Sequence, residues 1–273
     1  MMKKVASVVA IIGIVATLVA GCGGQKAASP SPTEKKSIKV GVTAGPHAEI
    51  METVKKIAAK DGLEIQIIEF SDYITPNVAL SQGDIDANSY QHQPFLDNQV
   101  KDRKYKIVSI GKTVIFPMGV YSKKIKNLAD VKNGATVAIP NDPSNGGRAL
   151  LLLEKANLIE LKPEAGIKAT VADITANPKS IKIKEIDAAQ IPRSLDDVDV
   201  AAINTNYAIL AGLVPTKDAL AIENADSPYA NVIAVRTKDK DNAAFQKLLK
   251  AYHSAEVKHW IEEKYKGTFV PTW

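Results

Sequence analysis

The sequence predicts an α/β protein of two lobes with a ligand cleft between them. The chain has 273 residues, and single hydrophobic cores stop growing at roughly 250 to 300 residues, so two cores are favoured. A pattern of apolar run, amphipathic stretch and second apolar run begins at Ile38 and starts again at Thr136. With 45% hydrophobic and 24% charged residues, the bulk of the chain has the composition of a globular protein.

Residues 1–21 have the pattern of a signal peptide. Two lysines open the segment, and residues 5–20 carry no charge. That run is shorter than the roughly 20 apolar residues of a membrane-spanning helix. Small residues precede Cys22, which resembles a lipobox, the motif whose cysteine becomes a lipidated N-terminus. We expect Cys22 to carry acyl chains that attach the protein to a membrane; the open alternative is an uncleaved anchor in which Cys22 is an ordinary residue.

The first lobe is expected to span residues 38–118. A tether, residues 22–37, precedes it, because Gly, Ala, Ser, Pro and Lys dominate there and no large apolar residue could join a core. The lobe opens with a buried strand at 38–42, an amphipathic helix at 48–60 and a second strand at 63–68.

The second lobe is expected to span residues 119–235. It repeats the same opening, with a strand at 136–140, a helix at 148–156 and a strand at 181–186. Residues 141–147 between that strand and helix are rich in turn formers.

Two crossovers are expected to join the lobes. The apolar stretch 113–121 is β-prone and is broken by proline and glycine, so we expect a crossover strand with hinge positions there. The chain would return near residues 231–236, and residues 236–273 would rejoin the first lobe, mainly as helix.

Side chains near the expected strand ends suit a small zwitterion with an apolar tail. In α/β proteins ligands bind where strands end. Arg148 could bind a carboxylate bidentately, together with free amides at the start of its helix. Asn204 and Asn231 could orient an ammonium and a carboxylate, although Asn at strand ends is more often a turn residue. Aromatic rings and an imidazole could enclose a thioether, or could simply pack on their own lobe; they include Tyr73, Tyr90 and His92.

Composition argues against several other functions. Without Lys3 and Lys4, 33 basic residues face 30 acidic ones, and the two signs are mixed, so nucleic acid is not an expected partner. A single cysteine excludes an internal disulfide and a multi-cysteine metal site. Common catalytic and nucleotide-binding motifs are missing and the four histidines are scattered, so we expect no enzyme, cofactor or metal site. An enzyme without a known motif, a metal-binding receptor and a structural lipoprotein stay open as alternatives.

Five runs of the chain resemble the NlpA family of lipoproteins, and in particular its methionine-binding members. The resemblance extends from Cys22 to Trp273. The runs are VGVTAGPH at 40–47, NSYQHQPFL at 88–96, PNDPSNGGR at 140–148, PRSLDD at 192–197 and SPYAN at 227–231.

The resemblance implies a clamp like that of periplasmic binding proteins, held by lipid on the outer face of the cell membrane. Such a protein captures methionine, of L or D configuration, and delivers it to the permease of an ABC transporter. A methionine-containing dipeptide or another small apolar amino acid is the alternative ligand. By the resemblance, Arg148 and Asn231 would hold the head group with Asn204 beside them, and Asn145 would add a supporting contact from the loop of Arg148. The residues implied for the side-chain pocket are Tyr73, Tyr90 and His92.

Overall fold

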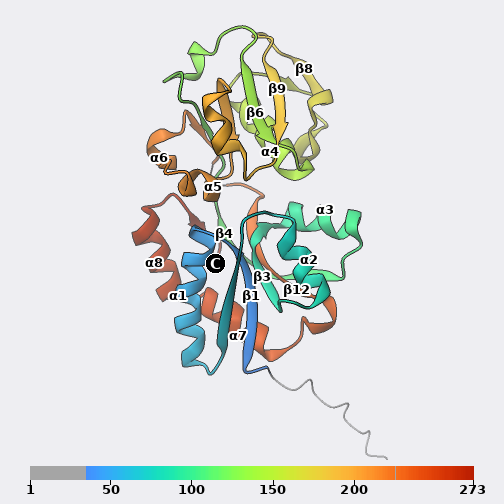
Figure 1. The fold of residues 1–273 in the computed structure, drawn as a ribbon, viewed down its shortest axis with the longest axis vertical. Coiled ribbons are helices and arrows are strands. Elements are labelled where there is room, and N and C mark those ends of the chain that lie inside the picture. Colours follow the sequence, from blue (N-terminus) through green and yellow to red (C-terminus); the bar gives the residue numbers. More distant parts are fainter. Residues whose placement is uncertain (1–34, 225) are drawn as a thin grey trace, which may run out of the picture. The chain divides into compact units, whose positions relative to one another are not determined.

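The structure, a computed structural model, describes residues 35–224 and 226–273. Two large mixed sheets organise these residues, and each sheet carries helices on both of its faces (Figure 1). This arrangement confirms the predicted α/β class and its two lobes. The expected signal peptide and Cys22, with most of the expected tether, lie outside the described residues.

The first lobe is built on a six-stranded sheet. Its spatial order is β13 (Val270–Pro271), β4 (Ile107–Ile115), β12 (Ala230–Arg236), β3 (Ala87–His92), β1 (Ser37–Thr43) and β2 (Glu64–Phe70). β1 runs parallel to both of its neighbours, whereas β12 is antiparallel to β3 and β4. Val40 and Val42, which share one face of the central strand β1, are fully buried under the helices that cover that face.

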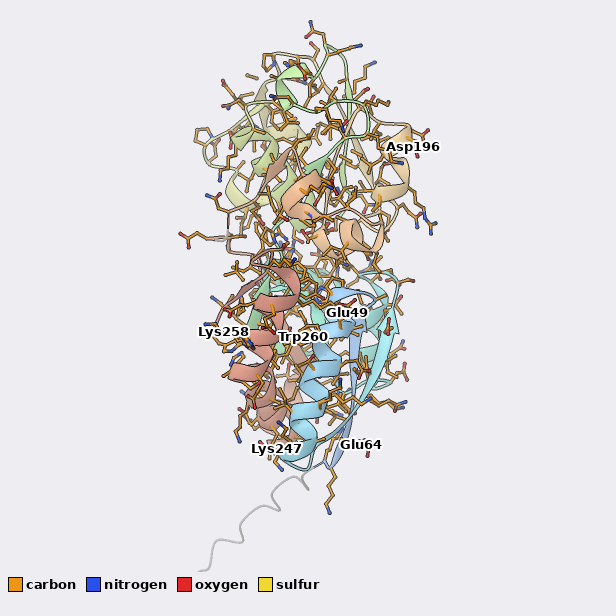
Figure 2. All side chains as sticks on the ribbon, turned by 90° about the vertical axis from the view of Figure 1, so that its left-hand side faces the viewer. Glu49, Glu64, Asp196, Lys247, Lys258 and Trp260 are labelled. Carbon is orange, nitrogen blue, oxygen red and sulfur yellow. The ribbon has the colours of Figure 1, made fainter. Side chains whose placement is uncertain are left out.

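Helices cover both faces of the first sheet. One face carries α1 (Pro46–Lys60), α7 (Ala243–Tyr252) and α8 (Ala255–Tyr265), and the other carries α2 (Thr75–Gln82) and α3 (Gln93–Arg103). Figure 2 shows α8, with Trp260, beside α1, with Glu49. The Glu49 carboxylate accepts from the Tyr265 hydroxyl at 2.7 Å and pairs with Lys264 at 2.8 Å, which links the two helices.

The second lobe is built on a five-stranded sheet. Its order is β11 (Ala221–Ile222), β5 (Gly119–Tyr121), β10 (Val200–Ile203), β6 (Thr136–Pro140) and β9 (Lys182–Ile186). Helix α4 (Pro143–Lys155) packs on one face and α5 (Thr205–Leu210) on the other. The remaining elements are α6 (Pro215–Asp218), the paired strands β7 (Glu160–Leu161) and β8 (Ile174–Ala176), and 3₁₀ turns at Leu128–Asp130, Gly166–Lys168, Val171–Asp173, Ile191–Asp196 and Thr237–Asp239.

The chain crosses between the lobes at 116–118, between β4 and β5, and again between β11 and β12. The expected strand 113–121 is therefore two strands in two different sheets. β12 already belongs to the first sheet, so the second lobe ends before residue 230 and not at residue 235. The reason is that β12 fills the gap between β3 and β4, a pairing that its apolar sequence alone did not reveal.

Element boundaries differ from expectation in three further places. β1 begins at Ser37, inside the expected tether. α4 begins at Pro143 and not at Arg148, because proline suits the first helical position and Asp142 caps the helix. The C-terminal helical segment is divided at Ser254, whose hydroxyl caps α8. None of the described helices has the length and apolar character needed to cross a membrane.

Candidate functional site

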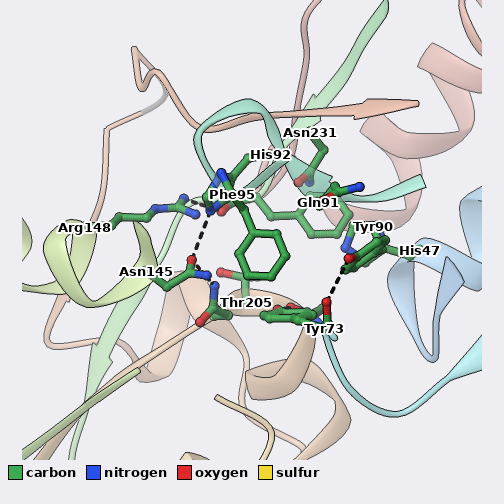
Figure 3. A pocket seen from close by; sticks show the side chains of 13 residues that line it. His47, Tyr73, Tyr90, Gln91, His92, Phe95, Asn145, Arg148, Thr205 and Asn231 are labelled. Atoms are coloured by element: carbon green, nitrogen blue, oxygen red, sulfur yellow. Dashed lines mark hydrogen bonds between the residues drawn. The ribbon is translucent and has the colours of Figure 1, made fainter. Parts of the chain in front are cut away.

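One cavity is lined by side chains from both lobes (Figure 3). Every side chain that the sequence singled out for binding lies on its wall: Tyr73, Tyr90, His92, Asn145, Arg148, Asn204 and Asn231. The other lining residues are His47, Gln91, Phe95, Phe116, Thr205 and Asn206.

Arg148 is the one formal charge among the described residues that line the cavity. It lies on the second turn of α4, and only 4% of its side chain is exposed. Its Nε donates to both carboxylate oxygens of Glu223 at 3.1 Å, and its Nη2 donates to Glu223 and to the carbonyl oxygen of Phe116. The guanidinium carbon also lies 4.4 Å from the centre of the Tyr229 ring. A carboxylate, a carbonyl oxygen and an aromatic ring thus fix the guanidinium plane.

The edge of Arg148 that a ligand could reach differs from the expectation. Glu223 occupies the Nε and Nη2 edge, so among the described residues the two N–H groups of Nη1 are left for a ligand carboxylate. At the start of α4 the Asp142 carboxylate accepts from the backbone N–H of Asn145 at 2.9 Å, so that amide is engaged and a negative charge already lies there. Among the described residues, this arrangement favours a contact through Nη1 over the expected bidentate contact supported by helix amides.

Aromatic rings form another part of the wall. The Tyr73 ring centre lies 6.0 Å from those of Tyr90 and Phe95, and 4.8 Å from that of Tyr207. The Tyr90 hydroxyl donates to the Tyr73 carbonyl oxygen at 2.8 Å, and the Tyr73 hydroxyl donates to Asn206 Oδ1 at 2.5 Å. Burial raises the pKa of both Tyr73 and Tyr90 well above the usual value, so both phenols stay neutral. The rings offer an apolar, polarisable surface to a ligand tail.

Two buried histidines add neutral imidazoles to the cavity. Burial lowers the pKa of His47 to about 3, and its ring lies 4.4 Å from Phe116. Burial, with a smaller contribution from the charge of Arg148, lowers the pKa of His92 to about 3 as well. The Nδ1 of His92 accepts from the backbone N–H of Phe95 at 3.1 Å, which makes His92 the cap of α3 as well as a wall residue.

Two amide atoms at the cavity are buried without a hydrogen-bond partner among the described residues. They are the Oδ1 of Asn204 and the Nδ2 of Asn206. Native proteins satisfy nearly all such atoms, so this acceptor and this donor, which lie beside one cavity, are available to a polar ligand. Asn204 Oδ1 suits an ammonium group and Asn206 Nδ2 suits a carboxylate or carbonyl oxygen.

Asn231 and Gln91 line the wall from neighbouring strands. Asn231 lies opposite His92 in the pairing of β12 with β3. Gln91 exchanges two hydrogen bonds of 2.8 Å with Asn77, so its amide is engaged within the first lobe. We therefore assign Gln91 a structural place in the wall.

Several site residues escaped the sequence reasoning. Asn206 and His47 lie in segments that follow strands, where position alone could have indicated them. Phe95 lies within a run that carries the family resemblance. Glu223 had no sequence signal, since its position 75 residues after Arg148 says nothing about their pairing.

The arrangement can hold a zwitterion but offers no metal site. A cation, open amide atoms and a wall of rings complement a charged head group with an apolar tail. In the described part of the chain, His, Cys, Asp and Glu nowhere form a group of three or more that could bind a metal ion.

Comparisons with known proteins agree with this geometry. The family model described as NlpA lipoprotein matches residues 38–273. The D-methionine-binding lipoprotein MetQ of Salmonella typhimurium is 48% identical over 274 residues, which cover 99% of this chain and 98% of that protein. A solved structure of a nutrient binding protein from Burkholderia cenocepacia bound to methionine is 58% identical, with a TM-score of 0.84 and coverage of 86% of this chain and 100% of that one. A crystal structure of the methionine binding protein MetQ is 47% identical, with a TM-score of 0.85 and coverage of 87% and 98%.

These relatives are named for binding and not for catalysis, which confirms the prediction of a binding protein. The match extends over nearly the whole chain and includes the segments that build the cavity. The chain belongs to the NlpA lipoprotein family.

Proposed function

We propose that this protein captures methionine outside the cell membrane and delivers it to the permease of an ABC importer. The observation that carries the proposal is the cavity itself, where a fixed guanidinium and two open amide atoms lie beside a wall of aromatic rings. Relatives named as methionine-binding proteins support this choice of ligand. Acyl chains on Cys22 would hold the protein at the membrane, because several chains together give stable attachment.

The cavity should recognise the amino-acid head group more strongly than the sulfur. Removing one partner from a buried charged contact costs about 2 to 5 kcal/mol. Burying an apolar chain of this size contributes about 1.5 to 3 kcal/mol, and a sulfur–aromatic contact adds about 0.3 to 1.5 kcal/mol. We propose that Arg148, Asn204, Asn206 and Asn231 contact the head group, with rings and His92 around the thioether.

Mass spectrometry of ligand released from gently purified protein tests the proposal directly. We expect methionine, and titration calorimetry with L-methionine, D-methionine and methionine-containing dipeptides then ranks the forms. Release of a different small molecule, or no heat and no thermal shift with any of these ligands, contradicts the proposed ligand.

Delivery and anchoring need separate measurements in cells. We expect Cys22→Ser to move the protein from the membrane fraction to the soluble fraction while methionine binding is retained. Loss of methionine uptake on deletion of the protein, restored by the wild-type chain, would support delivery to an importer. Unchanged uptake after deletion in a strain without another methionine transporter would contradict it.

A further inference from the structure

Asp142 fixes which way the amide of Asn145 points. Its Oδ1 accepts from the backbone N–H of Asn145 at 2.9 Å and from the Ser144 hydroxyl at 2.8 Å. Its Oδ2 accepts from Asn145 Nδ2 at 2.9 Å. Because a carboxylate accepts and does not donate, the Nδ2 of Asn145 must face Asp142, and its Oδ1 must face the other way.

His92 independently requires the same orientation. Its Nδ1 accepts from the backbone N–H of Phe95, so the proton of the neutral ring is on Nε2. That Nε2 donates to Asn145 Oδ1 at 3.1 Å (Figure 3). Asp142, at the Nδ2 atom, and His92, at the Oδ1 atom, therefore require the same orientation of the Asn145 amide.

The orientation passes from Asn145 to Asn204. Asn204 Nδ2 donates to the same Asn145 Oδ1 at 2.8 Å. Its own Oδ1 is then the atom left over, and this oxygen is buried with no partner among the described residues. Were Asn145 reversed, Asn204 would reverse too and would present a donor in place of an acceptor.

We propose that Asp142 is a positioning residue that makes Asn204 present an acceptor to the ligand ammonium, although Asp142 is not among the residues that line the cavity. The inference rests on the proposed function, since it assumes an amino acid as ligand. Asp142, Asn145 and Asn204 all belong to the second lobe, so the orientation needs no contact from the first lobe. His92 adds its hydrogen bond from the first lobe.

The variant Asp142→Asn tests this role because asparagine caps helices as well as aspartate does. Its amide can offer one acceptor, either to the Asn145 backbone N–H or to Asn145 Nδ2, but not to both. Keeping the cap therefore turns an N–H group of residue 142 toward Asn145 Nδ2, and we expect this repulsion to outweigh the hydrogen bond from His92, to reverse Asn145 and Asn204, and to turn a donor toward the ammonium. We expect methionine affinity to fall roughly 10- to 100-fold, the range for a buried polar group left unpaired.

The control ligand is 4-(methylthio)butanoate, which is methionine without its ammonium group. We expect the affinity of this ligand for Asp142→Asn to stay within about threefold of its affinity for the wild type. The ligand has no ammonium group to contact Asn204, so one buried polar atom of the Asn204 amide stays unpaired in both proteins. The control variant is Asp173→Asn. Asp173 also accepts from a backbone N–H and a side chain, both of Thr170, but it lies outside the cavity lining, so its replacement should leave the ratio of the two affinities unchanged.

Nitrogen NMR of the His92 ring gives a readout that a purely structural cap would not move. We expect the Nε2-protonated form in the wild type and loss of the Nε2 hydrogen bond in Asp142→Asn. An unchanged ratio of the two affinities, or an unchanged His92 ring signal, overturns the role of Asp142 while leaving the proposed function intact. Failure of the wild type to bind methionine would instead refute the proposed function.

If Asp142→Asn does not fold, Asp142→Ser keeps a cap acceptor and releases only Asn145 Nδ2, and it should show a smaller fall in the same ratio.

Discussion

Replacing Arg148 by alanine should nearly abolish methionine binding. The substitution removes the only formal charge on the described cavity wall. Losing the partner of a buried carboxylate costs about 2 to 5 kcal/mol. At about 1.4 kcal/mol for each factor of ten, affinity should fall roughly 30- to 4,000-fold.

The same substitution should also lower stability, because Glu223 loses its partner. Its side chain is 16% exposed and would keep the backbone N–H of Met118, at 3.2 Å, as a donor. Removing one member of a buried ion pair costs about 3 to 5 kcal/mol, and the partial exposure of Glu223 favours the lower end. For a protein of this size, about 3 kcal/mol corresponds to a fall in Tm of roughly 6 to 12 °C.

Titration calorimetry and thermal unfolding of two variants separate these effects. Arg148→Ala should lose both affinity and stability, whereas the double variant Arg148→Ala with Glu223→Gln should regain much of the stability and none of the binding. A folded Arg148→Ala protein whose methionine affinity lies within about threefold of wild type would refute the assignment of Arg148 to the ligand carboxylate.

Three further outcomes are expected. Norleucine, in which a methylene replaces the sulfur, should bind about 2- to 12-fold more weakly than methionine in calorimetry, and equal affinities would contradict a thioether contact. Burial lowers the pKa of His47 and His92 to about 3, against 6.5 in the unfolded chain, so their full contribution to the free energy of unfolding is present above pH 6.5. Below pH 6.5 the free energy of unfolding should fall by about 1.4 kcal/mol per pH unit for each histidine. A denaturant midpoint that stays constant from pH 7 to 4 would count against their burial. In Gly147→Ala the new Cβ would lie 3.0 Å from the carbonyl oxygens of Ile167 and Ala169, so we expect a loss of about 1 to 3 kcal/mol in urea unfolding, and a neutral result would show that this backbone yields.

The sequence predicted the fold wherever apolar periodicity was strong. The strand beginning near Ile38 and the helix that follows it were predicted within a few residues, because one face of that strand and one face of the helix are apolar. The place of β12 could not be predicted in this way. Its apolar run is compatible with either sheet, and only its pairing with β3 and β4 decides the lobe.

The sequence could predict several of the residues that line the site, but not which side chains they would hydrogen-bond to. Position after a strand and family resemblance indicated Arg148 and Asn204, which both line the cavity. The sequence could not show that Glu223 occupies one edge of the guanidinium, or that Asp142 orients the amide of Asn145. Such contacts depend on tertiary distances and on amide orientation, neither of which leaves a pattern along the chain.

Arg148 also touches both segments that connect the lobes. It donates to the carbonyl oxygen of Phe116 in one connection, and in the other it meets Glu223 and the ring of Tyr229. Glu223 in turn accepts from the backbone N–H of Met118, which ties the two connections together. The side chain that is expected to bind the ligand carboxylate therefore contacts both connecting segments, where hinge motion between the lobes is expected. A ligand without a carboxylate would make no contact with Arg148 and so would not act on the connecting segments. One guanidinium would thus serve both ligand recognition and closure of the lobes.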